Sequence, residues 1–154
     1  MAKMGLSMRD DPVRVIDVGA RQWGEPANGF VLSVESVVLK EDRGVLSNLS
    51  VVLRNISAET RSLVVPGWMF FLHVELTGPD GNPVPMSPFG RELLRPERRT
   101  EKIPVTLAPG AHVETQIPIG SFFDMRARGV YHVVVWCEPA GGSAVRSNSL
   151  AIPV

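Results

Sequence analysis

The sequence predicts an all-β fold in which two antiparallel sheets pack face to face. Apolar and polar residues alternate with period two over six segments, which is typical of strands with one buried face. Fourteen glycines and thirteen prolines divide the 154-residue chain into short segments separated by turns. No long stretch shows the 3.6-residue period of an amphipathic helix. Together these features favour a two-sheet sandwich over a helical bundle.

The predicted strands follow in chain order as 30–35, 49–54, 70–77, 111–117, 131–137 and 149–154. Turns are expected where glycine, proline, aspartate and asparagine cluster, at 42–44, 79–83, 108–110 and 140–142. A short helical turn is predicted over 120–125, with Ser121 as its cap. The charged segment 91–102, which Pro96 interrupts, is expected to be a long exposed connection. We expect residues 1–12 to be a flexible leader and residues 13–154 to form a single β-sandwich domain.

Composition excludes several classes of function. Sixteen basic and sixteen acidic side chains cancel, so no overall field attracts nucleic acid. No apolar run approaches the roughly 20 residues that span a bilayer, so no membrane insertion is expected. The single cysteine excludes an intramolecular disulfide and a cysteine-based zinc cluster. The N-terminus lacks the apolar core of a signal peptide.

The segment 128–137 contains the only tyrosine and the only cysteine. Gly129 and Tyr131 stand at the start of a strand, as in the tyrosine corner of immunoglobulin-like folds, where the tyrosine hydroxyl bonds backbone a few residues upstream. Cys137 has the same parity as Tyr131 and is therefore expected to face inward as an inert apolar side chain. The sequence thus predicts an immunoglobulin-like sandwich without a disulfide.

Three motifs carry a family resemblance: VVLRNIS at 51–57, DGNPVP at 80–85 and the segment 105–135. In order and spacing they resemble the non-catalytic β-sandwich domain that accompanies deuterolysin-like and peptidyl-Lys zinc metallopeptidases. A looser similarity links them to the intracellular proteinase-inhibitor family of bacilli. The chain has no His-Glu-x-x-His motif, so no catalytic residue carries over. The resemblance implies a bacterial accessory module in the periplasm or outside the cell, with its signal peptide removed.

An immunoglobulin-like arrangement makes the strands at 69–77 and 130–137 neighbours in one sheet. Their outward positions form the candidate binding face, which comprises Phe71, His73, Glu75, His132, Val134 and Trp136. This face suits a protein interface anchored by its aromatic side chains, or a sugar stacked on Trp136. His73, Glu75 and His132 could also bind zinc. Alternatively, the 83–102 connection or the leader covers the face.

We therefore predict a non-enzymatic accessory or protein-interaction module that needs no cofactor and no metal. Its partner is expected to be another protein or domain, with a weak homodimer as the alternative. One alternative is a proteinase inhibitor that acts through the loop 84–104. The other is a carbohydrate-binding module that uses Trp136 or Trp68.

Overall fold

The computed structural model describes residues 20–41, 44–98, 102–139 and 142–154. The predicted leader at 1–12 lies outside these residues, as do parts of the turns predicted at 42–44 and 140–142. The elements are β1 (Phe30–Glu41), β2 (Gly44–Asn55), β3 (Arg61–Val65), α1 (Trp68–Phe71), β4 (His73–Thr77), α2 (Pro88–Leu93), the 3₁₀ turn η2 (Pro96–Arg98), β5 (Ile103–Leu107), β6 (His112–Ile117), α3 (Ile119–Phe122), β7 (Val130–Cys137), β8 (Val145–Arg146) and β9 (Leu150–Pro153). None of the helices in the described part of the chain is long and apolar enough to cross a membrane.

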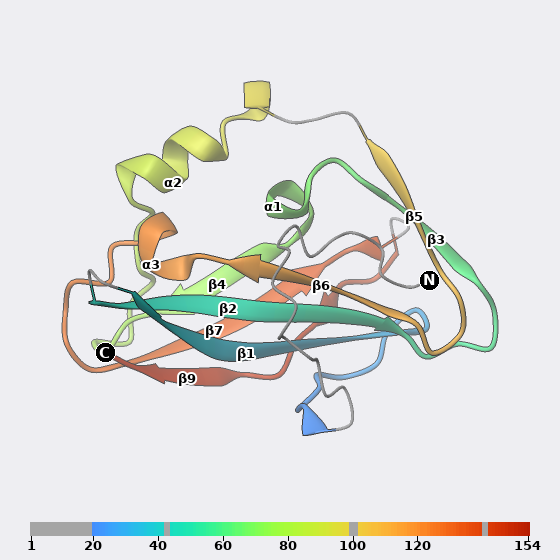
Figure 1. Cartoon of the computed structure of the whole chain (residues 1–154), viewed down its shortest axis with the longest axis horizontal. Coiled ribbons are helices and arrows are strands. Elements are labelled where there is room, and N and C mark those ends of the chain that lie inside the picture. The colour runs from blue at the N-terminus through green and yellow to red at the C-terminus, as the bar shows by residue number, and fades with distance from the viewer. Residues whose placement is uncertain (1–19, 42–43, 99–101, 140–141) are drawn as a thin grey trace.

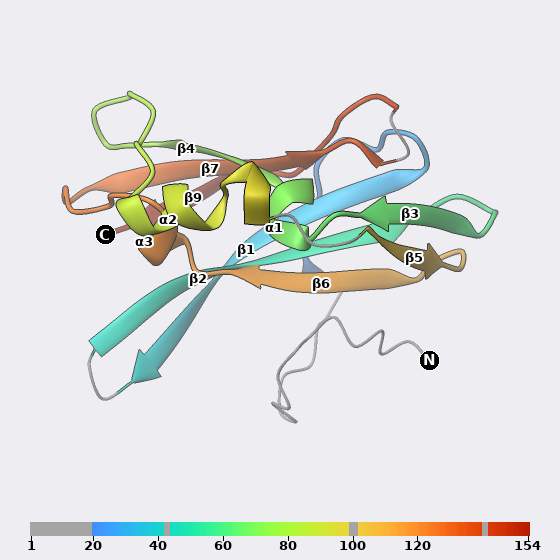
Figure 2. The same ribbon diagram turned by 90° about the horizontal axis from the view of Figure 1, so that it is seen from above.

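The strands form antiparallel sheets, as the sequence predicts for an all-β fold (Figure 1). One sheet has the order β1-β2-β6, a two-stranded ribbon joins β3 to β5, and β7 pairs with β4, β8 and β9. Viewed from above, β4, β7 and β9 lie in one layer and β2 and β6 in another (Figure 2). The helices α1 and α2 lie along one side of these layers, at the top of Figure 1.

The core consists of the inward-facing apolar side chains of these strands. Leu32, Val34 and Leu53 come from β1 and β2, and Val133 and Val135 come from β7; each is almost completely buried. Burial alternates along β7 as the period-two pattern predicts. Apolar burial of this extent stabilises the fold without a disulfide.

Two side-chain hydrogen-bond clusters fix the ends of strands. The Tyr131 hydroxyl donates to the Ala127 carbonyl at 2.6 Å, which is the bond expected of a tyrosine corner. Gly129, two residues before Tyr131, has φ 140° and packs against Pro79, so a side chain could not be accommodated there. At the end of β2, the buried Asn55 amide donates to the carbonyls of Glu59 and Leu107, at 2.8 and 2.9 Å. Its carbonyl oxygen accepts from the Ser57 backbone N–H at 2.9 Å.

The strand predicted at 70–77 begins three residues later than expected. Residues 68–71 form the helical turn α1, and the Leu72 N–H closes it by donating to the Trp68 carbonyl at 3.0 Å. The sequence WMFF of this turn is entirely apolar, so it fits the period of a helix as well as that of a strand. The strand was therefore predicted to begin too early. Gly67, with φ 114°, precedes the turn. Phe71 consequently points into the core and meets Trp68 edge-on, with ring centroids 5.5 Å apart.

The prediction of an exposed connection over 91–102 is wrong at its start, because α2 extends to Leu93. Ser87 caps α2 by accepting from the Gly90 N–H at 3.0 Å, and Pro88 fills the first helical position. Gly90 is pressed against the Phe122 carbonyl, which leaves no room for a β-carbon. The helix is therefore fixed to the body of the protein.

The short helix predicted at 120–125 is present as α3, but at 119–122. Ser121 does not cap it, because it lies within the helix and Pro118 precedes the first turn. Instead the Ser121 carbonyl accepts a hydrogen bond of 2.6 Å from the Ser87 hydroxyl. This bond joins α3 to the cap of α2.

Candidate functional site

The candidate face is the outer side of β4, β7 and β8. The strands predicted at 69–77 and 130–137 were expected to be neighbours, and this pairing is confirmed for residues 73–77, since β4 pairs with β7. In this register His73 lies opposite Trp136, Glu75 opposite Val134, and Thr77 opposite His132. His73, Glu75 and His132 are exposed, whereas Val134 and Trp136 are half-buried.

His73 and Trp136 stack on one another. Their ring centroids are 4.1 Å apart and the ring planes differ by 19°. Because directly opposed residues have Cβ atoms only about 5 Å apart, two planar side chains of a cross-strand pair can lie face to face. The pair therefore forms a stacked aromatic surface on the sheet, and His73 covers one face of the indole.

An ion pair crosses the same surface. Arg146 on β8 lies opposite Trp136, on the other side of β7 from β4. Its guanidinium nevertheless reaches Glu75 on β4, with hydrogen bonds of 2.9 and 3.4 Å. The Arg146 side chain must therefore extend across β7, next to Trp136.

The charges of this pair are stabilised mainly by one another. The hydrogen bond from Arg146 lowers the pKa of Glu75 below its ordinary value, and a hydrogen bond from Trp136 lowers it further. The same hydrogen bond raises the pKa of Arg146. Both side chains are about half-exposed, so solvent screens the pair and its contribution to folding stability is small.

One member of the predicted face lies elsewhere, and another is remote from the His73–Trp136 pair. Phe71 belongs to α1 and is buried in the core, so its assignment to the outer face is wrong. His132 is on the face, but four residues along β7 from Trp136, which separates it from His73 by about 13 Å. The zinc interpretation required His73, Glu75 and His132 to converge. No group of three potential metal ligands occurs among the described residues, so this interpretation is wrong.

The described part of the 83–102 connection does not cover the face. It runs toward α3, where Ser87 bonds Phe122 and Ser121 and the Pro85 carbonyl accepts from the Asp124 N–H. His73 and Glu75 remain exposed. The leader, the other proposed cover, lies outside the described residues.

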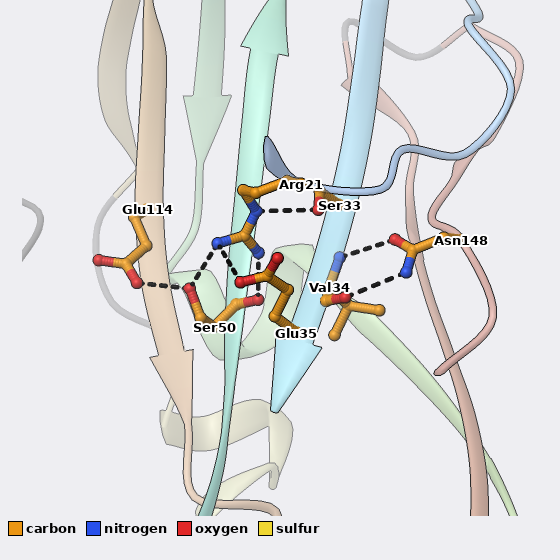
Figure 3. A network of polar contacts seen from close by, with 7 residues as sticks. All are labelled: Arg21, Ser33, Val34, Glu35, Ser50, Glu114 and Asn148. Carbon is orange, nitrogen blue, oxygen red and sulfur yellow. Dashed lines mark hydrogen bonds and ion pairs between the residues drawn. The ribbon is translucent and has the colours of Figure 1, made fainter. Parts of the chain in front are cut away.

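The opposite sheet carries a polar network that the sequence analysis missed, centred on Arg21 (Figure 3). Its side chain is only 3% exposed and lies 3.5 Å from Glu35. It donates to the hydroxyls of Ser33 and Ser50, at 2.9 and 3.2 Å, and to the Ser50 carbonyl at 2.8 Å. The Ser50 hydroxyl donates to Glu114 on β6 at 2.5 Å. These bonds anchor the chain before β1 to the outer face of the sheet β1-β2-β6.

A second part of Figure 3 shows how β1 is joined to the other layer. The Asn148 side chain accepts from the Val34 N–H at 2.9 Å and donates to the Val34 carbonyl at 3.1 Å. The Asn148 amide thus makes the two backbone hydrogen bonds that a neighbouring strand would otherwise make with Val34. The adjacent Ser147 hydroxyl accepts from the Val135 N–H on β7 at 2.9 Å.

The cysteine offers no nucleophile. Cys137 is fully buried, and this burial, with a smaller effect of Glu138, raises the pKa of its thiol to about 12. His132 lies on the outer side of the same strand and is exposed, so the two cannot form a catalytic pair. No protein-family model matches the chain, and a search of curated proteins returns no significant match.

Proposed function

We propose that the chain is a non-enzymatic, immunoglobulin-like β-sandwich module that binds another protein through the outer face of β4, β7 and β8. The observation that carries the proposal is the His73–Trp136 stack beside the Glu75–Arg146 ion pair. Tryptophan and arginine are the residue types most enriched at the energetic centres of protein interfaces. Here both stand on a strand surface with partly exposed side chains.

The packing of two aromatic side chains supports the proposal. Stacking of the His73 and Trp136 rings on one another restricts their rotamers before a partner arrives. Pre-organised side chains lose less conformational entropy on binding, so more of the contact energy remains as affinity. Val134, half-buried beside Trp136, adds apolar area at the centre of the same face.

The sugar-binding alternative has less support. A sugar ring stacks on an open aromatic face, but His73 occupies one face of Trp136 and the side chain of Arg146 runs across the strand beside it. The inhibitor alternative used an exposed loop over 84–104. Residues 88–93 of that segment are helical, and Gly90 is pressed against Phe122.

The state of the Cys137 thiol argues against a cysteine nucleophile. The Cys137 thiol is buried and protonated at neutral pH. The immunoglobulin-like assignment draws on the Tyr131 hydroxyl bond to Ala127 and on the resemblance to metallopeptidase accessory domains. An accessory role would give the module a partner domain to hold.

The test compares three baits: the wild-type protein and two double variants. His73→Ala with Arg146→Ser removes both features of the face without emptying the core, since both side chains are exposed. Ser62→Ala with Thr106→Ala alters exposed positions of the β3-β5 ribbon and is the matched control. Quantitative affinity capture from an extract of the source organism should yield proteins that the control retains and the face variant loses. Equal recovery by all three baits would reject the proposal.

A further inference from the structure

A groove of about 810 Å³ lies beside α2 and α3, away from the face of His73 and Trp136. Its lining includes Met86, Arg91, Phe123, Asp124, Met125 and Arg126. This volume is within the range of ligand sites in proteins. Arg91 and Arg126 at its rim are exposed, so the groove is open to solvent rather than enclosed.

The floor of the groove is apolar. Phe123 is buried, and Met86 and Met125 are half-buried beside it. An antiparallel bridge joins Met86 to Phe123, and the Asp124 N–H donates to the Pro85 carbonyl at 3.0 Å. The backbone of the floor is therefore fixed. Unbranched methionine side chains adapt to different apolar partners, which suits a surface that accepts side chains of several shapes.

The rim is positively charged. Arg126 makes a bidentate pair with Asp124, with two bonds of 2.7 Å, and this pair lowers the pKa of Asp124 and raises that of Arg126. The negative charge of the Asp124 carboxylate is thereby balanced by the positive charge of Arg126. Arg91 donates to the Met86 carbonyl at 2.7 Å, which holds its guanidinium at the groove. A guanidinium has five N–H donors in a planar fork that matches a carboxylate.

We propose that this groove binds an extended peptide segment in which an acidic side chain stands beside apolar ones. The apolar side chains contact Met86, Met125 and Phe123, and the carboxylate pairs with Arg91. An open groove suits a passing chain better than a small ligand, which binding sites bury over most of its surface. The site is separate from the proposed binding face, so either proposal can fail alone.

The test uses a displayed library of random dodecapeptides selected against the purified protein. Selected peptides should combine Asp or Glu with neighbouring apolar residues. Arg91→Glu should weaken their binding by about tenfold or more, because it replaces a charge-assisted hydrogen bond with repulsion. Arg95→Glu is the matched control: this arginine is exposed and pairs with Glu92 and Glu97. It should change affinity less than about twofold, as should the His73→Ala with Arg146→Ser variant.

Methyl NMR of protein labelled at its methionines locates the site. A selected peptide should shift the signals of Met86 and Met125. Any of the following results would overturn the proposal: no enriched peptide, enrichment without acidic residues, unchanged affinity in Arg91→Glu, or shifts that spare both methionines. The last measurement uses decanoate as a small carboxylate ligand. If decanoate bound in the groove as tightly as the selected peptides, the peptide proposal would also be overturned, in favour of a small carboxylate ligand.

Discussion

Replacing Asn55 by alanine is expected to destabilise the protein by about 2–5 kcal/mol. The Asn55 side chain is fully buried and makes four hydrogen bonds, which is the full capacity of an amide. Alanine would leave the carbonyl of the buried Leu107 without this donor, at about 1–3 kcal/mol. The bonds to Glu59 and Ser57 lie nearer to solvent, so each contributes about 0.5–1 kcal/mol.

Urea denaturation measures this effect as a lower midpoint at an unchanged slope. Ser57→Ala is the control, because it removes only the hydroxyl bonds at the half-buried edge of the cluster; we expect about 0.5–1 kcal/mol. The reasoning would be refuted if Asn55→Ala lay within about 0.5 kcal/mol of wild type, or if Ser57→Ala cost as much.

Asn55→Asp gives the same argument a pH dependence. A carboxylate at this position would face the carbonyls of Glu59 and Leu107, so burial and repulsion would raise the pKa of the new aspartate in the folded state. A raised pKa means that the folded state binds the proton more tightly than the unfolded state does. The destabilisation should therefore be full above the folded pKa and shrink as the pH falls toward the unfolded value near 4.

Three further predictions concern single side chains. Tyr131→Phe removes only the 2.6 Å bond to Ala127 and should cost about 1 kcal/mol, seen by calorimetry as a fall of about 2–4 °C in Tm; an unchanged Tm would contradict a structural role for this bond. Arg21→Met should cost about 2–3 kcal/mol in urea, because it leaves the buried Ser33 and Ser50 without their donor, whereas exposed Arg95→Met should stay within about 0.5 kcal/mol. Cys137, with a pKa of about 12, should not react with a disulfide reagent at pH 8 in the native protein but should react fully in denaturant; rapid native labelling would show that the thiol is accessible.

The strands could be predicted where one face of the strand is buried and the other is exposed to solvent. In β7 the alternation of Tyr131, Val133 and Val135 with outward residues matches the observed burial. The ribbon β3-β5 was missed because its strands have only five residues each, and Pro104 in β5 argued against a strand. The helix α2 was missed although Ser87 and Pro88 form a recognisable start signal.

The candidate face was predictable in part for a related reason. Parity along β4 and β7 placed His73, Glu75, His132 and Trp136 outward, and the pairing of the two strands brought His73 to Trp136. Arg146 could not be found in this way. It lies on a two-residue strand, and its partner Glu75 is 71 residues earlier, so no local pattern joins them. Arg21 could not be predicted either, because nothing in the sequence of the segment before β1 shows that this segment folds back onto β1 and β2.

Site-specific photo-crosslinking in an extract of the source organism tests whether the outer face of β4, β7 and β8 binds a protein. A photoreactive amino acid replaces His132, exposed on the outer face of β7, or Ser62, exposed on β3 of the ribbon. We expect a discrete crosslinked protein from position 132 that disappears when Arg146→Glu is added, and none of that species from position 62. No crosslinked protein from position 132, or the same protein with equal yield from both positions, would contradict it.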